Sequence, residues 1–102
     1  MLKQYWWCNN NGYLSLDDLL EAKEGYYSFR SVRSGFSYYY NVDSVHLCKN
    51  KNGDVKIDGY VIREKSSTYF DYYIEHYFKK ECVSEIKKIT EEEFINLRKK
   101  IC

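Results

Sequence analysis

The sequence predicts a single α+β domain: a strongly bent antiparallel β-meander of about five strands with one short helix near each terminus. Three observations predict this class. Apolar and polar residues alternate over most of residues 26–89, helical spacing of apolar residues appears near both ends, and turn residues separate the alternating runs. Because 102 residues suffice for one core and not for two, we expect one domain over residues 1–102.

The first helix is predicted over about residues 16–24. Ser15 is suited to cap it, two aspartates follow in the first turn, and leucines recur at helical spacing. Gly25 is expected to end the helix, because glycine accepts the left-handed conformation common at helix ends. Ahead of this helix, residues 2–8 (LKQYWWC) predict a short strand, and residues 9–12 (NNNG) predict a turn.

The next segment predicts two strands around a turn at Ser34-Gly35. The alternation changes phase near Asp43-Ser44, and we expect a bulge or break there because a slip of one residue exchanges the two faces of a strand. The residues expected to share one face of a strand before that point are Phe36, Tyr38, Tyr40 and Val42, and Val45 and Leu47 take their place after it.

A hairpin is predicted at Asn52-Gly53, which lies between two alternating runs. Asn-Gly favours a two-residue hairpin turn because both residues accept positive φ. After this turn, Val55, Ile57 and Val61 are expected to point to one side, with a bend at Gly59.

Residues 68–82 fit two patterns. Aromatic and β-branched residues favour a strand, in which one face would carry Phe70, Tyr72, Ile74, His76 and Phe78. The same segment also fits a helix, with Phe70, Tyr73, Ile74, Tyr77, Phe78 and Cys82 on one side. We favour the strand, and we expect a further strand over residues 83–89 and then a helix whose start is marked by the capping box of Thr90 and Glu93.

The bent sheet is expected to be similar to an SH3-like half-barrel with the terminal helices covering its open parts. The order of a short helix, Gly25-Tyr26-Tyr27, the Asn52-Gly53 hairpin and the stretch from Ile89 to Phe94 resembles short uncharacterised β-meander proteins of phages and mobile elements. These features lie within residues 16–101. The resemblance implies an accessory protein of a phage or mobile element and fixes no activity.

Composition argues against several classes of protein. No apolar run approaches the ~20 residues that a membrane-spanning helix needs, and the N-terminus lacks an apolar signal-peptide core. We therefore expect no membrane partner and a cytoplasmic location, the host cytoplasm if the chain is phage-encoded. In that reducing compartment the four cysteines would stay free thiols. The net charge of +1 also argues against a dedicated non-specific nucleic-acid binder.

No residue pattern indicates catalysis, a metal or a cofactor. His46 and Cys48 would share a face of a strand, but a nucleophile pair also needs an orienting third group, and we expect a half-buried histidine beside a buried thiol. A zinc site from His46, Cys48, His76 and Cys82 lacks the closely spaced ligand pairs of common zinc motifs. We expect a protein that is not an enzyme and that uses no metal or cofactor.

The aromatic content is the feature that points to a function. Twelve tyrosines occur on both faces of the predicted strands, and tyrosine is enriched at protein interfaces because it offers a large contact area with a polar tip. The alternative is that tyrosine is simply a good strand former on a half-exposed sheet. The residues predicted to bind a partner are Tyr38, Tyr39, Tyr40, Tyr69, Tyr73 and Tyr77.

The sequence thus predicts a non-enzymatic protein-binding module that binds a protein partner or a second copy of itself. Either an inhibitor of a host defence system or a virion component fits this class. The alternative is a small nucleic-acid- or nucleotide-binding β-barrel that combines the same aromatic residues with basic ones, as single-strand binders do. Its predicted contacts are Arg30, Arg33, Lys49, Lys51 and Lys56.

Overall fold

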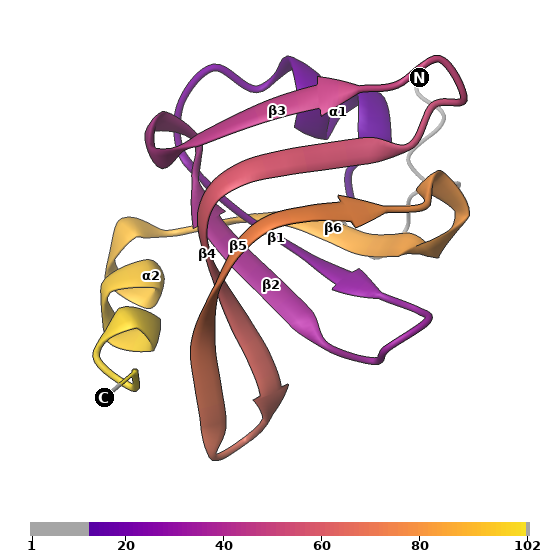
Figure 1. Cartoon of the computed structure of the whole chain (residues 1–102). Helices are drawn as coiled ribbons and strands as arrows, with labels where there is room; N and C mark the ends of the chain where they lie inside the picture. The colour runs from indigo at the N-terminus through magenta and orange to yellow at the C-terminus, as the bar shows by residue number, and fades with distance from the viewer. Residues whose placement is uncertain (1–12, 102) are drawn as a thin grey trace.

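The computed structural model describes residues 13–101, with the backbone alone at Glu75 and His76. Six strands curl into one antiparallel half-barrel sheet, with a short helix near each end of the described chain (Figure 1). The predicted strand at 2–8 and turn at 9–12 lie outside the described residues. The elements are α1 Leu16–Glu21, β1 Tyr26–Ser31, β2 Ser37–Asn41, η1 Val42–Ser44, β3 Val45–Lys49, β4 Val55–Ser66, β5 Tyr69–Phe78, η2 Lys80–Cys82, β6 Val83–Ile89 and α2 Glu91–Arg98.

The long strand β4 organises the sheet. β2 and β3 both pair with one side of it, through Tyr39 opposite Ile62 and Val45 opposite Gly59, while β5 pairs with the other side. The short 3-10 helix η1 separates β2 from β3, which confirms the break predicted at Asp43-Ser44. β1 pairs with β2, and β6 pairs with β1. The sheet is therefore a meander extended by β6.

The predicted bend at Gly59 is confirmed and has a steric cause. Gly59 has a φ of 128°, and a Cβ atom there would lie 2.6 Å from the backbone oxygen of Ser44. Glycine is required because both the backbone conformation and the close approach of η1 exclude a side chain. This bend lets one half of β4 pair with β3 and the other half with β2.

The β3–β4 hairpin forms as predicted, but its turn is longer than the predicted two-residue turn. The Gly53 amide donates to the Asn50 carbonyl at 3.0 Å, and of Asn52 and Gly53 only the glycine has positive φ, at 89°. The Asn50 side chain accepts hydrogen bonds from the amides of Asn52 and Asp54, both at 2.9 Å. These bonds stabilise a three-residue loop with a left-handed glycine, in preference to the turn expected from the Asn-Gly pair.

Helix α1 begins as predicted and ends early. Ser15 and Asp18 form a reciprocal capping box, but the helix ends at Glu21 because Ala22 is already extended, with ψ 132°. Gly25, at φ 109°, therefore does not end the helix. It lies at the entry to β1, where its carbonyl accepts from the Val42 amide at 3.0 Å. The chain needs these intervening residues to pass from the helix to the sheet.

Later elements follow the sequence more closely. Residues 69–78 form a strand, which settles the choice at 68–82, and β6 and α2 occur where they were expected. The predicted common face of β5 is not uniformly core: Phe78 is buried, Phe70 packs under α2, and Tyr72 and Ile74 are exposed. The pairing of β4 with β5 shifts register between Ile57 and Tyr60, so Phe78 packs into a different apolar cluster from Phe70, on the other face of the sheet. Helix α2 covers Phe70 and leaves Tyr72 and Ile74 exposed.

Two apolar clusters lie on opposite faces of the sheet. The larger fills the space enclosed by the curled sheet and α1, and its buried members are Leu19, Tyr27, Phe29, Tyr38, Tyr40, Val55, Ile57, Val61, Phe78 and Ile86. The smaller lies beneath α2 and consists of Ile62, Ile89 and Phe94 with partly buried neighbours. Consecutive residues Val61 and Ile62 are both buried because each faces a different cluster.

Candidate functional site

Two of the six tyrosines predicted to bind a partner lie in the core. Tyr38 is 4% exposed and Tyr40 is 0% exposed. The ring of Tyr38 stacks on Phe29 at 5.3 Å between centroids, and Tyr40 meets the same ring edge-on at 6.5 Å. The prediction is wrong for these two residues, because their face of β2 points into the larger cluster and no partner can reach it.

Tyr39 and Tyr73 are half-buried and are already engaged within the fold. The Tyr39 hydroxyl donates to the Glu64 carboxylate, and burial together with this negative charge raises the pKa of Tyr39. The Tyr73 ring lies 6.3 Å from Tyr38, and the Arg63 guanidinium lies 4.2 Å from its centroid. Both side chains stabilise the fold, so replacing them would test folding as well as binding.

Tyr69 and Tyr77 are exposed on β5, as partner-binding residues must be, and three more large side chains are exposed on the same hairpin. We call the five residues Tyr60, Tyr69, Tyr72, Ile74 and Tyr77 the hairpin surface. Across residues 13–101 there is one other large hydrophobic side chain in the exposed class, Val32 in the β1–β2 turn. The exposed apolar side chains therefore concentrate on β4 and β5.

The pairing of β4 with β5 brings three of these residues together. Tyr60 lies opposite Ile74, and the ring of Tyr72 meets that of Tyr60 edge-on at 5.6 Å. Tyr60 was not among the residues predicted to bind a partner, and Tyr72 and Ile74 were not predicted to lie at the surface. Alternation after the Gly59 bend places Tyr60 on the face opposite Val61, and this signal could have found it.

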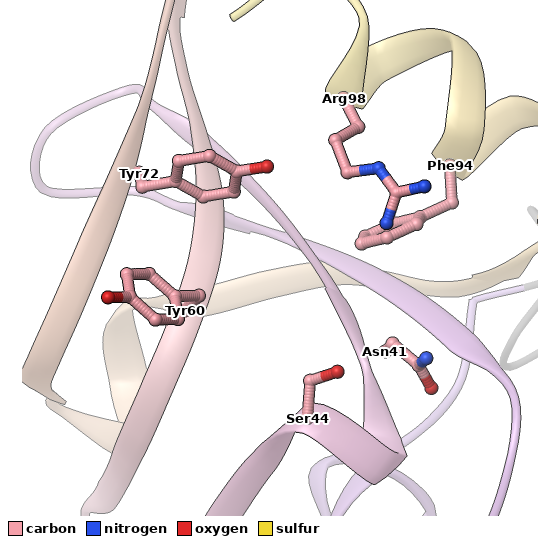
Figure 2. A pocket seen from close by; sticks show the side chains of 6 residues that line it. All are labelled: Asn41, Ser44, Tyr60, Tyr72, Phe94 and Arg98. Carbon is pink, nitrogen blue, oxygen red and sulfur yellow. The ribbon is translucent and has the colours of Figure 1, made fainter.

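A cavity of about 340 Å³ adjoins this group where the hairpin, η1 and α2 meet (Figure 2). Aromatic rings reach it from β4, β5 and α2, and polar groups reach it from the end of β2, from η1 and from α2. This combination of apolar walls and a few polar groups is typical of binding sites. The lining residues are Asn41, Ser44, Tyr60, Tyr72, Phe94 and Arg98.

The polar groups of the cavity are mainly donors. The Asn41 side-chain oxygen accepts from the Asp43 amide at 3.1 Å, which leaves its NH₂ group for other partners. The Arg98 guanidinium extends from α2 toward the ring of Phe94, and the Ser44 hydroxyl points into the space between the lining side chains (Figure 2). No ion pair within 4.0 Å involves Arg98 among the described residues.

Carboxylates lie beside the cavity without lining it. Tyr26, whose ring is 5.0 Å from that of Phe94, donates to Glu91 at 3.2 Å. The pKa of Tyr26 is raised, chiefly by burial and then by the negative charge of Glu91, while Arg98 acts in the opposite direction and Asp43 adds to the rise. Arg98 is thus the cationic group of the cavity, with two carboxylates in its neighbourhood.

The basic residues of the nucleic-acid alternative do not form one surface. Lys49, Lys51 and Lys56 surround the β3–β4 hairpin, whereas Arg30 and Arg33 lie at the β1–β2 hairpin, and Figure 1 shows the ends of these hairpins apart. Lys49 and Lys56 each lie 3.8 Å from a carboxylate, and Arg30 lies 3.9 Å from one. Tyr38 and Tyr40 are buried, so two of the aromatic rings expected to stack on nucleic-acid bases cannot do so.

The histidine and cysteine side chains are arranged differently from the expectation. His46 and Cys48 are both exposed on β3, because the alternate residues Val45 and Leu47 take the face toward the core. The prediction of a half-buried histidine beside a buried thiol is therefore wrong, because both side chains are exposed. Cys82 lies in η2, and the His76 side chain lies outside the described part of the chain. Among the side chains that are described, no three His, Cys, Asp or Glu residues are placed to hold a metal ion.

Comparisons with protein-family models, curated proteins and solved structures find no match to this chain. Within residues 13–101, no helix has the length and apolar character required to cross a membrane. The hairpin surface and the cavity are consequently interpreted from their own geometry and chemistry.

Proposed function

We propose that this chain is a non-enzymatic protein-binding module that docks its hairpin surface onto a protein partner. The observation that carries the proposal is the concentration of exposed tyrosines on one hairpin: four of the five residues of that surface are tyrosine. Exposed aromatic residues gathered in one region are typical of interaction sites, since burying their rings on binding removes apolar area from water.

The position of β5 in the sheet supports the same function. Among the described strands β5 pairs with β4 alone, so its other edge has backbone donors and acceptors that no strand satisfies. Such an edge accepts a strand from another chain, with main-chain hydrogen bonds supplying affinity and side chains supplying specificity. The exposed tyrosines lie on the strand that has this edge and on its neighbour.

The proposal leaves two kinds of protein partner, a foreign protein and a second copy of this chain. Native mass spectrometry of the purified protein separates them, because a dimer or larger ring assigns the hairpin surface to self-association and a monomer assigns it to a foreign protein. A role as an accessory protein of a phage or mobile element, either inhibitor or virion component, stays a prediction from the sequence.

The decisive variant replaces exposed residues of the hairpin surface and leaves the core intact. Tyr60→Ser, Ile74→Ser and Tyr77→Ser combined should reduce partner binding or self-association at least about tenfold, since each loses contact area at the interface. Thermal unfolding should change little, because the three side chains are mostly in solvent. Val32→Ser is the matched control, since Val32 is 63% exposed at a different place in the fold.

Equal binding by the triple variant and the Val32→Ser control would contradict the proposal.

The dependence of affinity on salt concentration is a second readout, which separates the proposal from the nucleic-acid alternative. An interface made mainly by tyrosine should lose less than about fivefold in affinity between 50 and 200 mM salt, whereas five phosphate contacts would lose several hundredfold. A steep loss of affinity, abolished by replacing the basic residues of the two other hairpins, would favour the alternative.

A further inference from the structure

The cavity beside the hairpin surface has a chemistry of its own. Its walls are the rings of Tyr60, Tyr72 and Phe94, and its charged group is Arg98. We propose that this cavity binds an aromatic side chain of the partner together with a neighbouring carboxylate, so that the recognised feature is an acidic, aromatic peptide segment. The inference rests on the proposed function, which it makes more specific by naming the partner's chemistry.

The size and walls of the cavity favour an aromatic side chain. A volume of about 340 Å³ holds one such side chain with room for a polar group, and it is too small for a folded element. Tyr60 and Tyr72 already meet edge-on at 5.6 Å, so a third ring can continue the same geometry. Phe94 is 8% exposed and is fixed against Tyr26, which makes that wall of the cavity rigid.

The charges around the cavity favour a single carboxylate. The lining residues supply hydrogen-bond donors from Arg98, Asn41, Ser44 and Tyr72, and none of the lining residues is acidic. A planar guanidinium matches a carboxylate through two parallel hydrogen bonds. A phosphate dianion fits less well, because Arg98 is the sole cation of the lining and the carboxylates of Asp43 and Glu91 act on the adjacent Tyr26.

The test uses small probes that require no knowledge of the partner. The ¹⁵N-labelled full chain is titrated with 4-hydroxyphenylacetate and with its uncharged analogue 4-hydroxyphenylacetamide, and binding is followed by NMR. The acid should bind about fivefold more tightly than the amide, which is the effect of one partly exposed charge-assisted contact. The resonances that shift should include the Asn41 and Arg98 side-chain N–H groups.

Matched variants assign the preference to a residue. Arg98→Gln should remove the difference between acid and amide, whereas Lys99→Gln should keep it, since Lys99 is the next residue on the chain and does not line the cavity. Tyr72→Ala should weaken both probes. Equal affinities for the two probes, identical behaviour of the Arg98 and Lys99 variants, or tighter binding of phenyl phosphate than of the carboxylate would overturn the inference.

Failure of this inference is distinguishable from failure of the proposed function. If the probes bind as expected but the triple hairpin variant retains every protein contact, the cavity is a small-ligand site and the proposed module is wrong. If the hairpin variant loses its protein partner but the probes show no preference for the acid, the module stands and the assigned partner chemistry is wrong.

Discussion

At the scale of single residues, the tyrosines of this chain occupy three environments. Tyr40 is fully buried, Tyr39 is half-buried and donates a hydrogen bond to Glu64, and Tyr60 is 61% exposed. The ring is apolar enough for a core and its hydroxyl is polar enough for a surface, so residue type alone does not decide between them. Neighbours along the strand alternate between these environments because successive side chains point to opposite faces.

The hydroxyl of Tyr40 yields a prediction about stability. It is buried without a hydrogen-bond partner among the described residues, and burial raises its pKa. Because removing an unsatisfied polar group relieves a desolvation cost, Tyr40→Phe should leave the free energy of unfolding unchanged or raise it by up to about 1 kcal/mol. Urea denaturation measures this change.

The neighbouring residue supplies the control for that prediction. Tyr39→Phe removes a hydroxyl that donates to Glu64, so it should lower the free energy of unfolding by about 1 kcal/mol. A loss of stability on Tyr40→Phe as large as that on Tyr39→Phe would mean that the Tyr40 hydroxyl has a partner and that the interpretation is wrong.

The ion pair between Arg63 and Asp71 predicts a dependence of stability on pH. Two hydrogen bonds, of 3.0 and 2.7 Å, join the guanidinium to the carboxylate, and Lys65 lies 3.7 Å away. Hydrogen bonding from Arg63, followed by its positive charge, lowers the pKa of Asp71 in the folded chain. The stability that this pair contributes is therefore present above the unfolded carboxyl pKa of about 4 and is lost as pH falls through the lower folded value.

Asp71→Asn should accordingly lower the free energy of unfolding by about 1 kcal/mol at pH 7, a value discounted for the partial exposure of the pair. The difference from the unmodified chain should shrink as the pH falls below about 4, and urea midpoints at pH 7 and pH 3 measure it. Asp58→Asn is the control, because its 3.8 Å contact with Lys56 is more exposed. A difference that stays constant down to pH 2 would contradict this account.

At the scale of elements, β4 shows how one glycine organises a sheet. The strand serves two neighbours on the same side, β3 and β2, because it bends at Gly59 where η1 crosses close to it. The two helices depend on local signals instead. Both start with reciprocal capping boxes, at Ser15 with Asp18 and at Thr90 with Glu93, which the sequence makes visible over four residues.

The bend predicts a large difference between two glycine substitutions. Gly59→Ala should lower the free energy of unfolding at least about 2 kcal/mol more than Gly35→Ala, measured by urea denaturation. Both positions have positive φ, but a Cβ at Gly59 meets backbone at 2.6 Å, while at Gly35 the nearest atom is a flexible Arg30 side chain at 3.7 Å. Similar losses at the two sites would show that η1 moves away from β4 readily.

At the scale of the whole molecule, the two faces of the sheet are covered to different extents. The enclosed face holds the larger cluster, and the other face is covered by α2 over Ile62, Ile89 and Phe70. Helix α2 spans eight residues, so it covers part of this face, and Arg98 at its end lines the same cavity as Tyr72 and Tyr60 (Figure 2). The cavity and the hairpin surface both result from this mismatch between a long hairpin and a short helix.

Much of the fold could be predicted from local patterns, and the candidate site could be predicted only in part. Alternation located the strands and the break before Val45, since burial on one face leaves a period of two in the sequence. Of the residues predicted to bind a partner, Tyr69 and Tyr77 lie at the surface, whereas Tyr38 is buried. The pattern marks which residues share a face of a strand, but it does not say what covers that face.

The sequence by itself determined the α+β class, the positions of the strands, both helix starts and the bend at Gly59. Each of these depends on residues close together in the chain: caps, turn formers and alternating side chains. Tertiary structure alone decided that Tyr40 lies in the core and that Arg98 lines a cavity together with Tyr72. Those outcomes depend on which distant element covers which face, and that contact between residues far apart in the chain leaves no local signal.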